Sequence, residues 1–181
     1  LESHASVTAL SGLDRQVLQT LAVEGATVIE NARVFRLTRE QERMRHELTL
    51  AHTIQQGLLP RQLPQSDYFE MRALSIPCRS VGGDYYDVVR LPDERYGFTV
   101  ADVSGKGLPA AILAATLQGA FAAVAAGDPD PRDLFQRMND FLCERTPTEM
   151  FATIFYGVLD RDGGFTFVNA GHAAPLVIRN D

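Results

Sequence analysis

Two aspartates stand where strand-like runs of the sequence begin or end. Asp84 follows Gly82-Gly83 at the start of one run, and Asp102 ends the next run, just before Ser104-Gly-Lys-Gly107. Glycines at such positions let the backbone turn sharply and approach a ligand closely. Because two strands joined by a short turn can pair antiparallel, their outer ends can lie side by side. The sequence therefore predicts that Asp84 and Asp102 face one cation-binding spot.

Two carboxylates without a nearby His or Cys favour Mg²⁺ or Mn²⁺, which take oxygen ligands and keep several bound waters. Such a water is a suitable nucleophile for in-line attack on phosphorus, and two neighbouring ions would hold the attacking and leaving oxygens. The residues alone leave an alternative, in which both aspartates only form turns after strands. Asp87 is a weaker candidate, because its place in the strand alternation also fits a surface residue or a group outside the metal ligands.

Lys106 suggests a nucleotide-binding loop, but its neighbours exclude one. The phosphate-binding pattern Gly-x-x-x-x-Gly-Lys-Ser/Thr requires glycine at position 100 and a hydroxyl residue at position 107. The chain has Val100 and Gly107 there. Gly105 and Gly107 are better interpreted as backbone that passes close to a metal or a substrate.

Asn169-Ala-Gly-His172 is a further polar cluster, placed directly after a strand-like run. His172 is a candidate general acid or phosphate contact. The alternative is a histidine in a turn, since the sequence gives His172 no partner.

The pattern beyond position 64 predicts three strands, two helices and three more strands. Hairpin-linked strands beside a helix pair indicate a mixed α/β sandwich rather than a doubly wound parallel sheet. The expected strands are 69–76, 85–91, 96–103, 153–160, 164–170 and 175–179, and the expected helices are 109–126 and 131–144.

A long helical pattern precedes this region, with Asp14 as its expected N-cap and Pro60 and Pro64 as its end. Such a helix needs packing against its own domain, a partner chain or both. A heptad repeat in its second half predicts a coiled coil and a homodimer. The seam positions are Val34, Leu37, Gln41, Met44, Leu48, Ala51, Gln55 and Leu58.

The length, net charge and apolar content of the chain limit the classes of protein to which it can belong. The chain has 181 residues and a net charge of −6, from 17 basic and 23 acidic residues. That size suits one domain with a helical extension, and that charge argues against a nucleic-acid partner. The apolar stretch 110–126 contains Gln118 and Gly119, so it is interpreted as a buried helix and not a membrane span. Two isolated cysteines are typical of reduced thiols in a cytoplasmic protein.

Several motifs together resemble the SpoIIE/RsbU-like bacterial phosphatases, a branch of the type 2C metal-dependent protein phosphatases. The resemblance covers residues 48–181. Its motifs are Leu50-Ala-x-x-Ile-Gln-x-x-Leu-Leu-Pro60, Val81-Gly-Gly-Asp-Tyr-Tyr-Asp87, Ala101-Asp-Val-Ser-Gly-Lys-Gly-Leu-Pro-Ala-Ala111, Asn139, Phe151-Ala-Thr153 and Asn169-Ala-Gly-His172.

This resemblance implies an αββα sandwich with a two-metal Mn²⁺ or Mg²⁺ site. Asp84 would bridge both ions, and Asp102 would bind one of them beside the backbone carbonyl of Val103. The implied substrate is a phosphoserine or phosphothreonine on a STAS-type anti-sigma-factor antagonist, in a partner-switching pathway. The helix before Pro60 resembles a regulatory helix that couples an upstream sensor to the metal site. Candidates for substrate contact or for support of the metal ligands are Gly83, Gly105, Lys106, Asn169 and His172.

Residues 11–36 resemble the final helix of a GAF sensor domain. The expected organisation is therefore a GAF-like tail at 1–36, a coiled-coil-like linker at 37–60 and a phosphatase domain at 61–181. The family's later Thr-Asp-Gly stretch, whose Asp completes the metal site, has no match here, and Asp162-Gly163 is a poor substitute. The expectation is thus of a C-terminally incomplete domain with weak metal binding. The alternative function is a non-catalytic dimerising module with an incomplete phosphatase fold.

Overall fold

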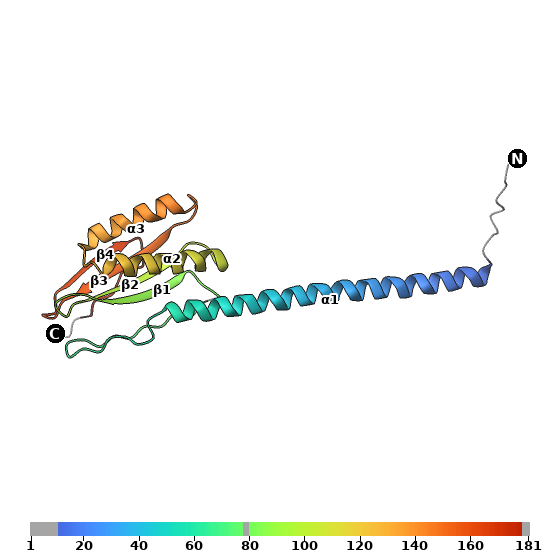
Figure 1. The fold of residues 1–181 in the computed structure, drawn as a ribbon, viewed down its shortest axis with the longest axis horizontal. Helices are drawn as coiled ribbons and strands as arrows, with labels where there is room; N and C mark the ends of the chain where they lie inside the picture. Colours follow the sequence, from blue (N-terminus) through green and yellow to red (C-terminus); the bar gives the residue numbers. More distant parts are fainter. Residues whose placement is uncertain (1–10, 78–79, 179–181) are drawn as a thin grey trace. The chain divides into compact units, whose positions relative to one another are not determined.

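The computed structural model describes residues 11–77 and 80–178 (Figure 1). Contacts divide the chain into two compact units, residues 1–47 and residues 48–181. The elements follow one another in the order α1 (Gly12–Leu58), β1 (Asp84–Arg90), β2 (Tyr96–Val103), α2 (Leu108–Ala125), α3 (Pro131–Arg145), β3 (Ala152–Leu159) and β4 (Phe165–Ala170).

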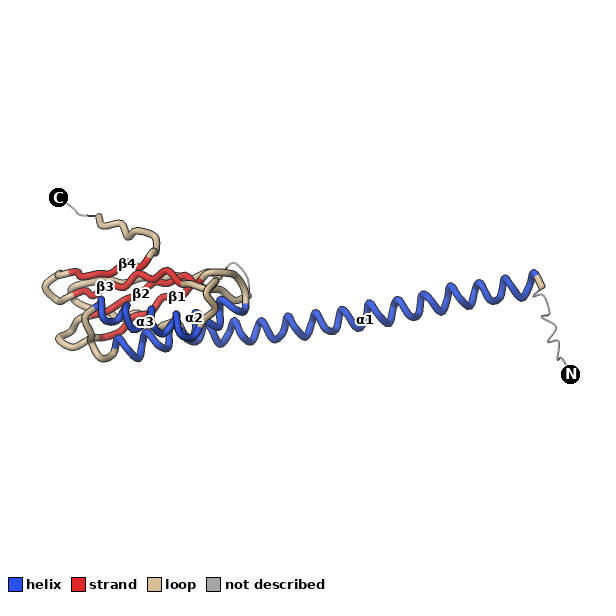
Figure 2. The backbone as a smooth tube through the Cα atoms, turned by 90° about the horizontal axis from the view of Figure 1, so that it is seen from above, coloured by secondary structure: helices blue, strands red, loops and turns tan. Residues whose placement is uncertain are grey.

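Helix α1 is one continuous helix of 47 residues (Figure 2). It begins with a reciprocal cap, in which the Asp14 amide donates to Ser11 Oγ and the Ser11 amide donates to the Asp14 carboxylate. The expected N-cap at Asp14 is therefore wrong by one turn, because Ser11 is the cap and Asp14 closes the box. None of the side chains of α1 is fully buried. Those half-buried in its last three turns are Leu48, Ala51, His52, Gln55 and Gln56.

The four strands form one antiparallel sheet in the order β1-β2-β3-β4. The register places Asp84 opposite Asp102, and Asp102 opposite Thr153. Neighbouring strands β2 and β3 are separated in sequence by α2 and α3. The three residues therefore meet at one end of the sheet although they come from distant parts of the chain.

Helices α2 and α3 cover one face of the sheet (Figure 1). Alternate strand residues such as Tyr85, Ala101 and Tyr156 point into this core, where the Tyr156 ring meets Phe121 of α2 edge to face at 5.2 Å. Within the described residues α2 is the one helix long and apolar enough to cross a membrane, but 44% of it is buried inside the fold. It is thus packed as a core helix, as the sequence predicted.

The other face of the sheet carries an aromatic cluster of Phe98, Phe155, Phe165 and Phe167, with Phe167 48% exposed. The strands predicted at 69–76 and 175–179 are wrong over the described residues, because 69–76 and 175–178 have no regular structure. A strand needs a neighbour for its backbone hydrogen bonds. No such pairing occurs here, and Leu74 and Leu176 are 82% and 84% exposed. The α/β fold is confirmed, with one sheet and one helix layer of the sandwich in the described part.

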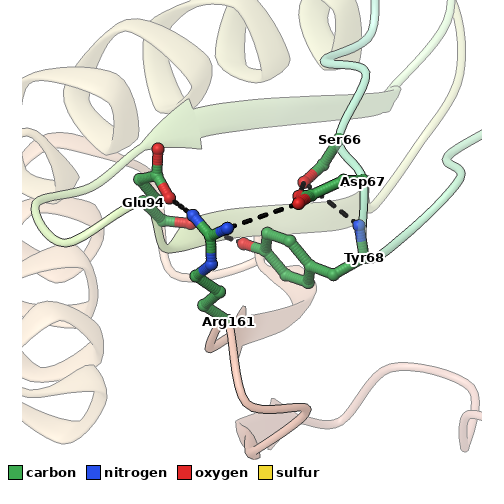
Figure 3. Close-up of polar contacts among 5 residues, drawn as sticks. All are labelled: Ser66, Asp67, Tyr68, Glu94 and Arg161. Carbon is green, nitrogen blue, oxygen red and sulfur yellow. Dashed lines mark hydrogen bonds and ion pairs between the residues drawn. The ribbon is translucent and has the colours of Figure 1, made fainter.

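Residues 66–68 are held at the end of the sheet away from the paired aspartates (Figure 3). Arg161, in the β3–β4 turn, pairs with Asp67 at 3.3 Å and with Glu94 of the β1–β2 turn. The Tyr68 hydroxyl donates to the Glu94 carbonyl. Exposed ion pairs contribute little energy, so this network fixes where the segment lies more than it stabilises the fold.

Two glycines provide a test of the packed face. A Cβ at Gly97 would lie 2.6 Å from the Tyr156 hydroxyl oxygen, and Tyr156 is fully buried. We expect Gly97→Ala to lower the free energy of unfolding by about 1–3 kcal/mol, as other overpacked cores do. Gly119→Ala, on the exposed side of α2 with nothing within 4 Å, should be neutral or stabilising. Urea unfolding of the two variants makes the comparison, and equal stability would contradict the packing described.

Candidate functional site

Asp84 and Asp102 lie at the same end of the sheet, on the face that the helices leave open. They are direct partners in the β1–β2 register, and both are exposed. The residue beside each, Tyr85 and Ala101, is buried on the helix side. Because successive strand residues point to opposite faces, burial of Tyr85 and Ala101 directs both carboxylates outward.

A hollow of about 430 Å³ opens over the two carboxylates. The sheet and the segment 72–76 form its walls, and His172 lies at its edge. Its lining residues are Arg72, Ala73, Leu74, Ser75, Ile76, Asp84, Tyr85, Tyr86, Val100, Ala101, Asp102 and His172. Such a hollow admits a small charged group carried on a larger molecule.

The pKa of the Asp84 carboxyl is raised above its usual value. Although the residue as a whole is exposed, partial shielding of its carboxyl group from water is the main cause of the raised pKa, followed by the negative charge of Asp102 and a hydrogen bond between the two carboxyl groups, while His172 acts in the opposite direction. Two carboxylates this close ionise together only at an energetic cost. A bound cation would remove that cost by supplying the positive charge that a shared proton otherwise supplies.

The backbone beside the carboxylates is also closely packed. The Val103 amide donates to the Gly83 carbonyl at 3.3 Å, and a Cβ on Gly83 would lie 2.6 Å from the Val103 carbonyl oxygen. Only glycine lets the two segments approach this closely, which explains Gly83 at this position. The Val103 carbonyl therefore lies at the same corner as Asp84.

These groups fit a hard divalent cation. The two carboxylates and the Val103 carbonyl are oxygen donors, and the remaining positions would be taken by water, as Mg²⁺ and Mn²⁺ allow. Across residues 11–77 and 80–178 there is no cluster of three or more His, Cys, Asp or Glu side chains that could hold a metal. The described site thus offers two carboxylates and one carbonyl.

The loop after Asp102 needs glycine for its backbone conformation, and the predicted close approach of Gly105 and Gly107 to a metal or substrate stays a prediction. Gly105 and Gly107 have φ values of 95° and 78°, a region that favours glycine. The loop is fixed by Ser104, whose amide donates to the Phe151 carbonyl and whose hydroxyl accepts from the Phe151 amide. Lys106 is exposed and does not line the hollow.

His172 has a partner that the sequence did not reveal. Its Nδ1 lies 2.9 Å from the Thr153 hydroxyl, and Thr153 is the residue opposite Asp102 on β3. The Asn169 side chain accepts from the His172 amide at 2.8 Å and donates to the His172 carbonyl at 3.1 Å. Asn169 therefore shapes the turn, and Thr153 orients the imidazole at the hollow's edge.

Asp87 lies outside the hollow. It is half-buried on the helix side of β1, where burial raises its pKa and hydrogen bonds with the Val88 amide and the Gln118 side chain lower it.

Gln55, like Thr153, is a residue that the sequence did not assign to the site. It was placed on the coiled-coil seam, whereas its side chain is hydrogen-bonded to the backbone of Gly82.

Several known proteins are similar to this chain in sequence. Residues 92–181 match the family model described as Stage II sporulation protein E (SpoIIE). Phosphoserine phosphatase RsbU of Bacillus subtilis (strain 168) is 31% identical over 133 residues, which cover 73% of this chain and 39% of RsbU. Protein IcfG of Synechocystis sp. (strain ATCC 27184 / PCC 6803 / Kazusa) is 29% identical, with 76% of this chain and 26% of IcfG covered.

A solved structure matches the fold. The SiaA-PP2C domain of Pseudomonas aeruginosa superimposes with a TM-score of 0.53 and 25% identity, over 67% of this chain and 50% of that one. The fold is that of an α/β domain of the type 2C phosphatase kind. Residues 92–181 thus match the SpoIIE family, and over 133 residues the chain is similar to RsbU, as its motifs indicated. The chain spans 39% and 26% of the lengths of the two sequence relatives.

Because the paired carboxylates repel each other, removing one of them should stabilise the metal-free chain and weaken cation binding. The raised pKa of Asp84 means that the folded chain holds its proton more tightly than the unfolded chain, whose usual value is 3.8. The associated stability is full below pH 3.8 and is lost as the pH rises through the folded pKa. Without metal at pH 7, we expect Asp102→Asn to raise the free energy of unfolding by about 0.2–1 kcal/mol, the range for cross-strand pairs.

The measurement is urea unfolding with a chelator and again with Mn²⁺. If Mn²⁺ stabilises the parent chain, Asp102→Asn should lose most of that stabilisation. Asp140→Asn, an exposed change on α3, is the matched control and should alter neither value. A metal-free Asp102→Asn chain less stable than its parent would contradict the repulsion.

Proposed function

We propose that this chain forms the phosphatase part of a metal-dependent protein serine/threonine phosphatase. The supporting observation is the pairing of Asp84 and Asp102 across β1 and β2, beside the Val103 carbonyl and under an open hollow. The 31% identity to phosphoserine phosphatase RsbU supports the same reaction. Asp84, Asp102 and the Val103 carbonyl would hold Mn²⁺ or Mg²⁺.

The chain's own residues have distinct tasks in this proposal. Bound ions supply a water of lowered pKa and neutralise charge on the phosphoryl group. Asp84 and Asp102 fix where that chemistry occurs, at the floor of the hollow. His172, oriented by Thr153, stands at the edge, where its Nε2 can hydrogen-bond to a phosphate oxygen or give a proton to the leaving serine oxygen.

We propose a phosphorylated STAS-type protein as the substrate, in a bacterial partner-switching pathway in the cytoplasm. The hollow opens on the surface of the sheet, so a phosphoserine on a folded protein can reach it. The negative charge of the chain, −6, disfavours nucleic acid as a competing partner. Residues 11–36 are assigned in the same proposal to the last helix of a GAF-like sensor.

An activity assay tests the phosphatase assignment. We expect Mn²⁺-dependent release of phosphate from a phosphorylated STAS protein by the full chain, and loss of at least about 100-fold in Asp102→Ala, because a metal ligand is removed. Asp140→Ala, which removes an exposed carboxylate of α3 that does not line the hollow, should retain the parent rate. Undiminished activity in Asp102→Ala would remove the aspartates from the catalytic site.

A second candidate is a non-catalytic dimerising module. The exposed apolar residues of α1 favour it, since Val34, Leu37 and Met44 are each more than half exposed. The described residues also offer only two carboxylates at this site and no third His, Cys, Asp or Glu ligand, which favours a non-catalytic module. A chain that dimerises but binds no Mn²⁺ and releases no phosphate would support this candidate.

Dimerisation itself is a prediction of both candidates. The seam through Val34, Leu37, Gln41 and Met44 should pair with a second copy, because heptad-spaced apolar residues exposed on one chain are buried between two. Light scattering at several concentrations should give a dimer. Leu37→Glu with Met44→Glu should give a monomer, whereas Leu50→Glu, exposed but off the seam, should remain dimeric. A parent chain that is monomeric throughout would contradict the seam.

A further inference from the structure

We propose that Arg72 is a specificity-determining residue, which binds an acidic side chain next to the phosphoserine of the substrate. This inference rests on the proposed function, because it takes the hollow over Asp84 and Asp102 as the place where the phosphoserine is held. Arg72 and the two aspartates belong to the same unit, residues 48–181. The site would thus select phosphoproteins that carry Asp or Glu beside the phosphorylated serine.

The charges around the hollow single out Arg72. Among the described residues that line the hollow, Arg72 is the one whose side chain is positively charged at every physiological pH. Asp84 and Asp102 are acidic, and the chain as a whole has a net charge of −6. An acidic segment of a substrate is therefore repelled by most of this surface and attracted at the guanidinium of Arg72.

Arg72 stands at the rim of the hollow and not at its floor. Its side chain is 89% exposed, although the residue lines the hollow. Asp84 and Asp102 lie opposite each other on the strands that form the floor. The phosphoryl group has to reach the two aspartates, so a side chain at the rim meets the substrate residues beside the phosphoserine.

A second hollow gives the substrate chain a path past Arg72. It has a volume of about 400 Å³ and is lined largely by apolar side chains such as Phe98. Arg72 lines both hollows, which also share Ala73, Tyr86 and Val100. A substrate segment whose phosphoserine lies in the first hollow therefore passes Arg72 where it continues into the second.

The present partner of Arg72 shows the chemistry that this side chain takes. Arg72 Nε and Nη2 both donate to one oxygen of the Glu70 carboxylate, at 3.0 and 2.6 Å. A guanidinium binds a carboxylate best through two parallel hydrogen bonds to its two oxygens, which this contact does not provide. The Glu70 side chain is 66% exposed, and exposed ion pairs contribute little energy. A substrate carboxylate can therefore displace Glu70 and form the paired geometry.

The test measures binding of phosphopeptides that cannot be hydrolysed. In these peptides a phosphonate, with CH₂ in place of the ester oxygen, replaces the phosphoserine. One labelled peptide has alanine on both sides of the phosphonate residue, a second has aspartate and a third has lysine there. Fluorescence anisotropy with the full chain and Mn²⁺ gives the dissociation constants. Rates of phosphate release from the matching phosphoserine peptides give kcat and KM.

Four variants accompany the parent chain. Arg72→Ala removes the positive charge, Arg72→Glu reverses it, and Glu70→Gln removes the competing carboxylate. Arg137→Ala is the matched control, because Arg137 is an exposed arginine of α3 that lines neither hollow.

We expect the parent to bind the aspartate peptide about threefold more tightly than the alanine peptide, within the range of exposed ion pairs. Arg72→Ala should lose this preference, Arg72→Glu should prefer the lysine peptide, and Glu70→Gln should strengthen the preference for aspartate. Arg137→Ala should keep the preference of the parent. Added salt should weaken the preference, because both charges are exposed. The change should fall on KM and not on kcat, since the contact is the same before and during the reaction.

The outcomes separate this inference from the proposed function. An Arg72→Ala chain that keeps the preference for aspartate, or a parent that has none, would overturn the role of Arg72. Equal weakening of all three peptides in Arg72→Ala would also overturn it, because Arg72 would then bind the phosphoryl group itself. An Arg72-dependent preference in a parent that releases no phosphate would support Arg72 and count against the phosphatase proposal. A parent that binds none of the peptides would contradict both.

Discussion

The antiparallel register of β1 and β2 sets two carboxylates directly opposite each other, and much of the surrounding structure maintains that pairing. Like charges in this position destabilise a sheet. The next residue pair, Tyr85 and Ala101, is buried against the helices and holds the register. A one-residue slip would expose Tyr85 and turn Asp84 into the apolar core, which is far more costly than the repulsion. The core therefore keeps the charges together, and a bound cation would relieve their repulsion.

The sequence was sufficient to predict the pairing of Asp84 with Asp102. Glycines before one strand and after the other, with a short turn between the strands, determine an antiparallel hairpin whose outer ends meet. The two core helices were also predictable, because their apolar positions and flanking prolines are local signals. Helix α3 begins at Pro131, and Asp130 caps it by accepting from the Arg132 amide.

The features that the sequence could not give depend on contacts between distant residues. Residues 69–76 alternate as a strand does, but a strand forms only where a neighbour pairs with it, and no neighbour does so in the described chain. Thr153 carried no signal of its contact with His172, since 19 residues separate them. The sequence signal at Gln55 was misleading, because its spacing fits a heptad seam. Only the position of Gly82 in the fold shows what the Gln55 amide binds.

The last three turns of α1 show how one helical stripe serves two purposes. Leu48, Ala51 and Gln55 continue the 3-4 spacing of Val34, Leu37 and Met44, so a second copy of the helix and the chain's own domain present competing surfaces to it. Leu48, Ala51 and Gln55 are half-buried within their own unit, whereas the side chains of α1 before Leu48 are exposed, and Leu58 is exposed again. A coiled coil extended beyond residue 48 would have to displace the contacts that hold Gly82. If two copies do pair as proposed, the contacts at Gly82 are kept only where the pairing stays upstream of Leu48, in the part of α1 whose heptad side chains are exposed.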